Sequence, residues 1–454
     1  MSSLTLSRIQ FGDTAAFHIL WPMMSIGIAL FMVIMEALWL YKKDEAYYRQ
    51  LRFWTKIFVL TFAIGTASGL PLSFQFGTNW SQFSQATGDF MGNILGFETT
   101  IAFALESAFL AILIFGWKRV HPLMHFFANI MVFVGASLSA FWIMVANSWM
   151  QVPRGIEVQD GKIIVTNYMQ AIFNPDSIVS FLHMMGACIT ASLFLIGGIA
   201  AWKLLVSEAG PVRDFFRRAL IYSLAIAIFM TPFQIIVGDI SGLIIAKHQP
   251  EKLSAVELHW DTNAPNEGAP WNIIALPNST NDGNAFAVAV PNGLSVITTR
   301  SLNGTVEGLN TFPADERPTA LEATIVFYSF RVMVLIGIVL FLLTVWSVLL
   351  WWRGELSAER ITRHRVWLKC WVAAIPLGFI ATEAGWMVRE IGRQPWTVYH
   401  VMRTADSVSV GLTSPEVATT TIVMTTAYIV FSIVFVYLTY RIVRAGPDLT
   451  SPLP

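Results

Sequence analysis

Apolar residues gather in nine long stretches that are separated by polar connections. A helix that crosses the hydrocarbon core of a bilayer needs about 20 apolar residues, and each stretch is long enough. Their predicted limits are residues 11–41, 56–77, 93–116, 123–149, 177–206, 217–246, 321–352, 369–390 and 417–442. The pattern therefore predicts an all-α integral membrane protein with nine transmembrane helices.

One long polar connection divides the chain into three parts. Residues 1–246 hold the first six predicted helices, residues 247–320 form the connection, and residues 321–454 hold the last three helices and a C-terminal tail. The connection is rich in Asn, Pro, Gly and Thr and lacks helical periodicity. We therefore expect a loop with little regular structure, of the kind that usually has a function.

The composition supports a membrane protein, and the distribution of Lys and Arg predicts its orientation in the membrane. Hydrophobic residues make up 55% of the chain and charged residues 13%. Lys plus Arg equals Asp plus Glu at 29 each, so the chain has no net positive charge of the kind that would indicate binding to nucleic acid. Eighteen Lys and Arg lie at one set of helix ends, ten lie at the other, and Arg331 falls inside a helix. By the positive-inside rule, the N-terminus and the 247–320 connection lie outside and the C-terminus is cytoplasmic.

The chain has two cysteines, Cys188 and Cys370, both within apolar stretches. Two cysteines exclude a disulfide framework and a four-cysteine zinc or iron–sulfur site built from this chain alone. A metal would have to bind mainly His, Met or carboxylate side chains.

Several ionisable residues fall inside predicted helices, where charge is costly and usually functional. They are His18, Glu98, Glu106, His183, Asp239, Arg331 and Glu383, with Met333 as a soft ligand close by. The predicted limits place His18, Glu98, His183 and Glu383 within about two helical turns of the outer ends of four different helices. Ligands from separate helices are thus expected to converge at one depth.

Each candidate also has a structural interpretation. A lone His near a helix end more often pairs helices than binds metal, and a Met in an apolar helix usually packs. Arg331 needs an anion, which is either a cofactor carboxylate or a neighbouring acidic side chain. His121 and His125, near the cytoplasmic start of the fourth helix, are interpreted as interfacial residues.

Two intramembrane carboxylates, Glu98 and Glu106, lie about 80° apart around one ideal helix. This arrangement suits a ligand combined with a proton relay. Ser107 and Ser139 would continue a polar path, although serines in membrane helices more often join helices.

Ordered motifs along nearly the whole chain resemble subunit I of the cytochrome bd quinol oxidases. They are Phe-Gln-Phe-Gly-Thr-Asn-Trp at 74–80, Leu-Glu-Ser at 105–107, Ser-Ala-Phe-Trp-Ile-Met-Val-Ala-Asn-Ser-Trp-Met-Gln at 139–151, Gly-Asp-Ile-Ser-Gly at 238–242, Phe-Arg-Val-Met-Val at 330–334 and Gly-Arg-Gln-Pro-Trp at 392–396. The last motif closes the segment from Glu383 to Trp396.

The resemblance implies three haems near the outer face, two haem b and one haem d. By matching position, His183 and Met333 would be axial ligands of a low-spin haem b, and Glu383 would ligate a high-spin haem b. His18 would ligate a haem of the two-haem oxygen site, with Glu98 as a second ligand or near neighbour; which haem each of them serves stays open.

The resemblance also implies residues that transfer protons, residues that contact haem propionates and residues that contact quinol. Glu106 would carry protons towards the oxygen site, along a path with Ser107 and Ser139. Arg331 and Arg393 would meet haem propionates. Lys252 and Glu257 match quinol contacts, whereas without the resemblance they would be a solvated charge pair in a loop.

The implied protein is a multi-pass subunit in the bacterial cytoplasmic (inner) membrane. It would oxidise quinol at the outer face and reduce oxygen to water with cytoplasmic protons. Its partners would be subunit II, small single-span accessory subunits and the lipid bilayer. The short loop resembles cyanide-insensitive members and leaves the quinone type open, and Phe379, where some relatives have Trp, leaves open whether haem b replaces haem d.

Two other function classes compete with the oxidase. A carboxylate-gated ion transporter explains buried Glu residues but not two His and a Met towards one side, and the repeated halves or broken helices frequent in transporters are not evident. A haem-b electron-transfer anchor would need only His183 and Met333, and it leaves Glu98 and Glu383 unexplained.

Overall fold

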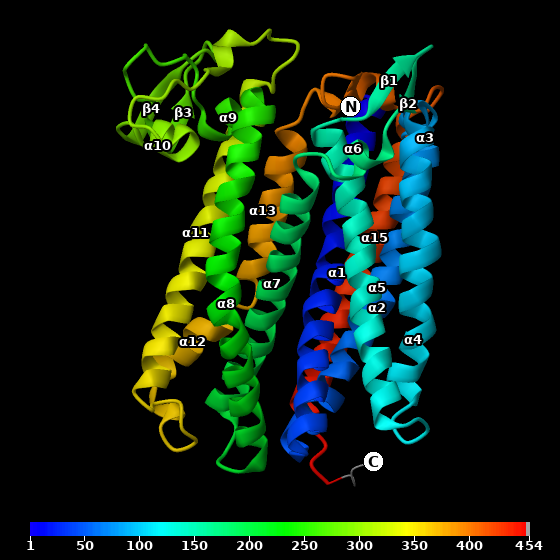
Figure 1. Cartoon of the computed structure of the whole chain (residues 1–454), viewed down its shortest axis with the longest axis vertical. Helices are drawn as coiled ribbons and strands as arrows, with labels where there is room; N and C mark the ends of the chain where they lie inside the picture. Colours follow the sequence, from blue (N-terminus) through cyan, green and yellow to red (C-terminus); the bar gives the residue numbers. More distant parts are fainter. Residues whose placement is uncertain (451–454) are drawn as a thin grey trace.

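The computed structural model describes residues 1–450, and nine membrane-length helical segments run along the long axis of this part of the chain (Figure 1). Their bounds are Ser3–Lys42 (α1), Glu45–Thr78 (α2), Ser81–Phe115 (α3, η1 and α4), Pro122–Gln151 (α5), Tyr168–Val206 (α6 and α7), Pro211–His248 (α8), Ala320–Trp352 (α11), Arg365–Ile391 (α12 and α13) and Ser414–Ala445 (α15). The prediction of nine membrane helices is confirmed. Most of these segments extend beyond the apolar stretch that predicted them.

Side chains that cap backbone N–H groups fix where several helices begin. The hydroxyl of Ser2 accepts a hydrogen bond from the N–H of Thr5 at the start of α1. Thr319 with Glu322 forms a capping box before α11, and Thr413 with Glu416 forms another before α15. Such caps satisfy N–H groups that have no partner within the helix.

Three of the nine segments consist of more than one element, and two of these interruptions fall inside predicted apolar stretches, which corrects the expectation of unbroken helices there. A π-helical turn, η1 (Glu98–Phe103), separates α3 (Ser81–Phe97) from α4 (Ala104–Phe115). The eighth segment breaks between α12 (Arg365–Ala373) and α13 (Leu377–Ile391), just where Pro376 cannot donate a backbone hydrogen bond.

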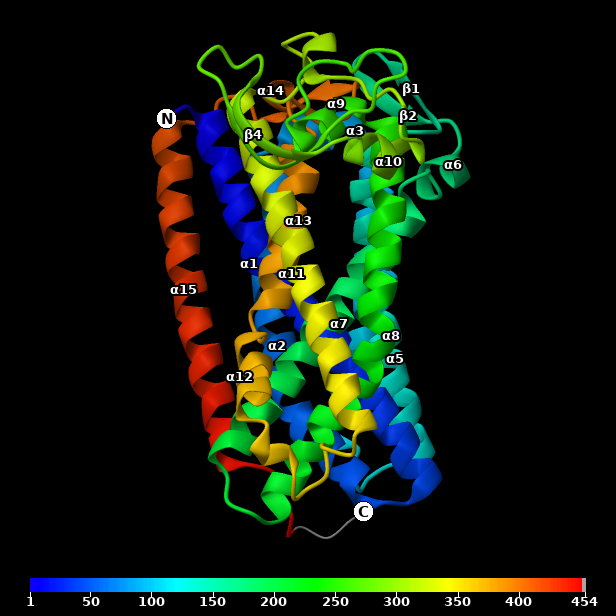
Figure 2. The ribbon, with the colours of Figure 1, turned by 90° about the vertical axis from the view of Figure 1, so that its left-hand side faces the viewer.

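The helices pack as two groups, one around α1 and one around α7, and the contact between α1 and α7 joins the two groups. Helix α1 packs on α2, α5, α7 and α15, while α7 (Ser177–Val206) packs on α8, α12 and α13, and α11 packs on α8 and α13. Between them lies a core of large apolar side chains, including Trp54, Phe194, Trp367 and Trp371. Figure 2 shows α15 at the edge of the bundle beside α1.

Burial differs strongly between the helices. In the most apolar window of the α6–α7 segment 78% of residues are buried, against 17% for the α3–α4 segment and 6% for α15. Helix α7 is therefore central, whereas α15 and α3–α4 present their apolar faces to surroundings outside this chain.

The long connection is folded, so the expectation of little regular structure is wrong. It contains α9 (Pro250–Glu257), an antiparallel hairpin of β3 (Trp271–Pro277) and β4 (Asn284–Val290), α10 (Gly293–Thr299) and the short turn η2 (Leu309–Thr311). The turn residues Asn278–Gly283, between two β-prone runs, are the signal that would have predicted the hairpin.

Smaller elements complete the same end of the molecule. They are the hairpin of β1 (Ile156–Gln159) and β2 (Lys162–Val165), α6 (Tyr168–Ile172), the pair β5 (Trp396–Val398) and β6 (Met402–Arg403), and α14 (Thr404–Ser407). The turn η3 (Ile361–Arg363) lies in the connection from α11 to α12. The N-terminus lies at the end that carries the long connection, and the C-terminal segment lies at the other end (Figure 1).

Candidate functional site

His18, halfway along α1, is held by a serine of α2. The Nδ1 atom of His18 lies 2.9 Å from the hydroxyl of Ser68, and that hydroxyl donates its own hydrogen to the carbonyl of Gly65 at 3.0 Å. Since the hydroxyl hydrogen is engaged, Ser68 accepts from Nδ1–H. The lone pair of His18 is then on Nε2, which is the arrangement of a metal-ligating histidine whose second nitrogen is oriented by a hydrogen bond.

Glu98 opens the π-helical turn η1, and such turns occur frequently at functional sites. One of its carboxylate oxygens accepts a 2.6 Å hydrogen bond from Ser139 of α5, and the other accepts from Thr99 at 3.2 Å. The structure therefore brings together two of the predicted path residues.

Glu106 lies next on the same segment and is buried, with 7% of its surface exposed. It packs against Gly135 of α5 so closely that a Cβ atom at that glycine would lie 2.8 Å from the Cβ of Glu106. A buried carboxylate at a helix contact fits the predicted relay. Ser107 is half-buried on the same helix and has no side-chain hydrogen bond among the described residues.

His183 of α7 faces α8. Its Nε2 lies 3.5 Å from the side-chain nitrogen of Gln234, and a Cβ at Gly238 would lie 3.2 Å from its ring. The Nδ1 of His183 and the side-chain oxygen of Gln234 are buried without a hydrogen-bond partner in the described structure.

Met333 of α11 and Glu383 of α13 lie on two helices that pack together. A Cβ at Gly385 would lie 3.0 Å from the sulfur of Met333, so the glycine keeps space open beside that atom. One carboxylate oxygen of Glu383 is buried without a partner in the described structure.

The side chains at these positions are suited to hold haem. Buried polar atoms in proteins are nearly always satisfied, so unpaired atoms on His183 and Glu383 indicate a partner outside the polypeptide. The donor set of imidazole, thioether and carboxylate suits haem iron. Within residues 1–450, no hydrogen bond joins His18, Glu98, His183 and Glu383 to one another, and they come from both helix groups.

Lys252 lies on α9 and is buried, with 2% of its surface exposed. Its ammonium group donates to the side-chain oxygens of Gln151 and Gln249, the latter at 2.8 Å. Burial, together with the positive charges of Arg389 and Arg393, holds the pKa of Lys252 well below its usual value.

Glu257 lies at the end of α9 and is also buried, with 4% of its surface exposed. Its carboxylate forms an ion pair with Arg331 at 2.5 Å. Burial raises the pKa of Glu257 to about 7, although the charge of Arg331 acts in the opposite direction. A carboxyl group with this pKa exchanges protons near neutral pH.

The structure shows the surroundings of these three charged residues. Lys252 and Glu257 are not a solvated pair, because both are buried in a helix and each has other partners. Arg331 has the neighbouring acidic side chain that was one of its two alternatives, and it also donates to the carbonyls of Val256 and Asn272. Its Nε is buried without a partner in the described structure.

A charged network joins α9 to the outer end of the bundle. Gln151, which binds Lys252, also donates to Glu390 at 3.3 Å, and Glu390 forms an ion pair with Arg393 at 2.6 Å. Arg389 pairs with Asp176 at 2.6 Å. The segment from Glu383 to Trp396 therefore both carries a candidate ligand and supports the loop helix.

His125 is not interfacial, which corrects the sequence interpretation. It is buried and hydrogen-bonds Glu36 at 2.7 Å and the carbonyl of Leu113 at 3.1 Å. Asn129 donates to the second oxygen of Glu36 at 2.8 Å. His121 instead begins α5 as its N-cap and is exposed.

Three supporting residues were not predicted from the sequence. Ser68, Gln151 and Asn272 orient His18, Lys252 and Arg331 across sequence separations of 50, 101 and 59 residues. Ser and Gln are common polar residues, so only the motif that ends at Gln151 gave any signal.

Comparisons with known proteins agree over the whole length. The family described as "Cytochrome bd terminal oxidase subunit I" matches residues 6–447. The chain is similar to the cytochrome bd ubiquinol oxidase subunit 1 of Bacillus subtilis (strain 168), with 33% identity over 99% of this chain and 95% of the relative. It is also similar to the cytochrome bd-II ubiquinol oxidase subunit 1 of Escherichia coli (strain K12), with 32% identity over 98% of this chain and 97% of the relative.

A solved structure shows the same fold. The bd oxidase from Geobacillus thermodenitrificans contains a chain that superposes with a TM-score of 0.88 at 31% identity, covering 98% of this chain and 99% of that one. Fold and sequence therefore point to one family.

Proposed function

Because the chain belongs to the cytochrome bd terminal oxidase subunit I family, and so is a subunit of a bacterial membrane quinol oxidase, we propose that it oxidises quinol at the end that carries α9. Oxygen would be reduced to water with protons taken from the opposite, cytoplasmic side. The single observation that carries this proposal is the buried pair Lys252 and Glu257 on α9, held in place by networks that reach the bundle.

The α9 side chains suit quinol chemistry. The ammonium group of Lys252 would donate a hydrogen bond to a quinol oxygen. Glu257, with its pKa raised to about 7, would accept the proton that quinol loses on oxidation. Arg331 would stabilise the carboxylate form of Glu257 through their ion pair.

The family implies haem, and we propose which residues of this chain would hold it. His183 and Met333 would bind a low-spin haem b, Glu383 a high-spin haem b, and His18 a haem of the oxygen site with Glu98 as a second ligand or neighbour. The bound haems, two haem b and one haem d or a third haem b, would supply electron transfer and oxygen reduction. The unpaired atoms of His183 and Glu383 support this assignment.

Protons would reach the oxygen site along the third segment. Glu106 would hold a proton in its buried position, and Ser139 of α5 donates a hydrogen bond to Glu98 at 2.6 Å. Ser107 would continue the polar path along α4. Arg393 would neutralise a haem carboxylate while it stays paired with Glu390.

Membership in the family implies a second subunit. We propose that subunit II covers the exposed apolar faces of α15 or of the α3–α4 segment, where few residues are buried by this chain. Small single-span subunits would take part of the remaining surface.

A reduced-minus-oxidised absorption spectrum of the purified complex tests the cofactor assignment. Haem bands are expected, and their absence would overturn it. The quinol site is tested with Lys252→Ala, which should lower quinol oxidation while oxygen consumption from an artificial electron donor stays near the wild-type rate. Equal loss with both donors would place Lys252 outside quinol chemistry.

A further inference from the structure

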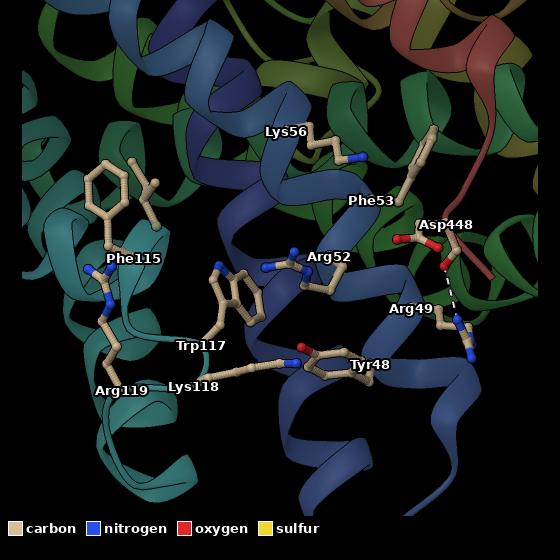
Figure 3. Close-up of a pocket in the computed structure, with 11 residues that line it drawn as sticks. Tyr48, Arg49, Arg52, Phe53, Lys56, Phe115, Trp117, Lys118, Arg119 and Asp448 are labelled. Atoms are coloured by element: carbon tan, nitrogen blue, oxygen red, sulfur yellow. Dashed lines mark hydrogen bonds between the residues drawn. The ribbon is translucent and has the colours of Figure 1, made fainter. Parts of the chain in front are cut away.

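A basic cavity of about 470 Å³ lies at the end of the bundle opposite α9, between the start of α2 and the segment that follows α4 (Figure 3). Five cationic side chains line it, namely Arg49, Arg52, Lys56, Lys118 and Arg119. One acidic residue, Asp448, also lies at its edge. The cavity is thus strongly positive in a chain whose total charge is balanced.

Most of this positive charge is not paired with an acidic side chain among residues 1–450. Arg49 pairs with Glu45 at 2.9 Å and donates to the backbone carbonyl of Asp448. Within residues 1–450, the other four cations form no ion pair with an acidic side chain of this chain. Like charges held together in this way favour an anion between them.

An aromatic side chain fixes part of the cavity. The guanidinium of Arg52 lies over the ring of Trp117, 4.3 Å from its centre, and Tyr48 packs edge-on against the same ring. Figure 3 shows Arg52 from α2 and Trp117 from the segment after α4 lying side by side. Trp and Tyr are enriched where membrane helices meet the lipid headgroups.

The cavity has an apolar wall as well as a charged one. Phe53, Ile114 and Phe115 line it, and Phe115 is 64% exposed. Lys56 lies about three turns above the start of α2, from where a long side chain reaches the headgroup level. A ligand that matches both walls carries a phosphate group and an acyl chain.

We propose that this cavity binds the phosphodiester headgroup of an anionic phospholipid from the leaflet at this end of the bundle. Basic pockets between membrane helices on the cytoplasmic side favour such headgroups, and arginine matches phosphate oxygens geometrically. Free phosphate is also an anion, but it has no apolar group that would pack against Phe53 and Phe115. The site is remote from α9 and is independent of the quinol and haem assignments.

The test uses the purified oxidase complex with subunit II in an uncharged detergent. Palmitoyl-oleoyl phosphatidylglycerol is titrated while the melting temperature is followed, in parallel with phosphatidylcholine of the same chains and with inorganic phosphate. Wild type is expected to be stabilised by phosphatidylglycerol more than by the other two. Lys56→Gln combined with Lys118→Gln should weaken the apparent affinity about 30-fold, from two lost charges near the surface.

The matched control is Arg365→Gln combined with Lys369→Gln. These cations are exposed at the same end of the chain, on α12, and lie outside the cavity. The control removes the same net charge and should keep the wild-type response. If the first pair does not assemble, Arg52→Gln with Arg119→Gln replaces it, and an unchanged haem spectrum certifies assembly.

Three results would overturn the proposal. Equal weakening in both charge-matched variants would indicate general attraction to the surface. An equal response to inorganic phosphate would indicate a free-anion site. Loss of subunit II from the Lys56 and Lys118 variant, without a change in lipid response, would assign the cavity to the partner subunit.

Discussion

At the scale of single residues, one serine assigns the tautomer of His18. Ser68 donates its hydrogen to the carbonyl of Gly65, so it accepts the Nδ1–H of His18 and leaves the lone pair of Nε2 free for the proposed haem iron. A hydroxyl that looked unremarkable in the sequence therefore belongs to the candidate haem site.

Replacing Ser68 with Ala should weaken haem retention at the His18 site about 10- to 100-fold, because the ring loses its orienting partner. The measurement is the haem-to-protein ratio and the oxygen-site absorption after dilution. Ser223→Ala is the control, since Ser223 is equally buried and its hydroxyl bonds only to the carbonyl of Ala219 in its own helix. Equal haem loss in both variants would contradict the positioning role of Ser68.

Met333→Leu tests the thioether ligand. Leucine preserves the volume and so should leave assembly largely intact, at a cost below about 1.5 kcal/mol, while the low-spin haem b band shifts or broadens. Met35→Leu, at a buried position of α1, is the matched control. An unchanged low-spin band in the Met333 variant would rule this sulfur out as a ligand.

The carboxyl group of Glu257 should make the rate of quinol oxidation depend on pH. Its pKa of about 7 means that the proton-accepting carboxylate is the main form only above neutral pH, so quinol oxidation should rise as pH increases through 7. At pH 6 the rate should be about one tenth of its plateau. Initial rates of quinol oxidation between pH 5.5 and 8.5 measure this.

Glu257→Gln should give a low rate without that rise. The same pH series with an artificial donor is the control, because it bypasses the loop. A rise of the same size in Glu257→Gln would assign the titration to another group.

At the scale of elements, α9 depends on one arginine from α11. The guanidinium of Arg331 binds the carboxylate of Glu257 and the carbonyls of Val256 and Asn272, so it joins α9 and β3 to a membrane helix. Removing one partner of a buried ion pair typically costs about 3–5 kcal/mol, because the other charge stays buried.

Arg331→Gln should therefore loosen the loop more than the bundle. Hydrogen–deuterium exchange is expected to rise in α9 and β3 and to stay low in α7, and quinol oxidation should fall. Arg300→Gln serves as the control, since Arg300 pairs with Asp239 of α8 and not with a residue of α9 or β3. Equal exchange changes in α7 and α9 would argue against a local anchoring role.

Breaks in two helices also matter at this scale. Pro376 separates α12 from α13, and η1 turns the segment that carries Glu98. Pro376 is visible in the sequence, but Pro22, Pro71 and Pro232 lie inside unbroken helices, so a proline alone does not mark the break. The π-helical turn was not visible in the sequence, because its apolar residues are equally compatible with a regular helix.

At the scale of the whole molecule, nine membrane segments in residues 1–450 place the N-terminus and the end of α15 at opposite ends of the bundle (Figure 1). The bias of Lys and Arg predicts that the N-terminus and α9 face outward. The basic cavity lies at the other end, and its five cations are among the residues that create this bias.

Reporter fusions test this orientation. Alkaline phosphatase inserted in the hairpin turn between β3 and β4 should be active, because that enzyme folds outside the cytoplasm, whereas a fusion after Arg444 should be inactive. A cytoplasmic fluorescent reporter at the same two positions is the complement. The reverse pattern would invert both the quinol face and the proposed lipid leaflet.

The sequence by itself determined the nine membrane helices, their predicted orientation and the identity of the candidate ligands. Hydrophobic length decides a membrane helix locally, and matching position within the resemblance names His18, His183, Met333 and Glu383 as candidates without reference to their neighbours. Only the tertiary structure decided the partners of these groups. Burial of Lys252, the pairing of Arg331 with Glu257 and the contact of Ser68 with His18 each join residues 50 or more positions apart, and such contacts depend on how helices pack.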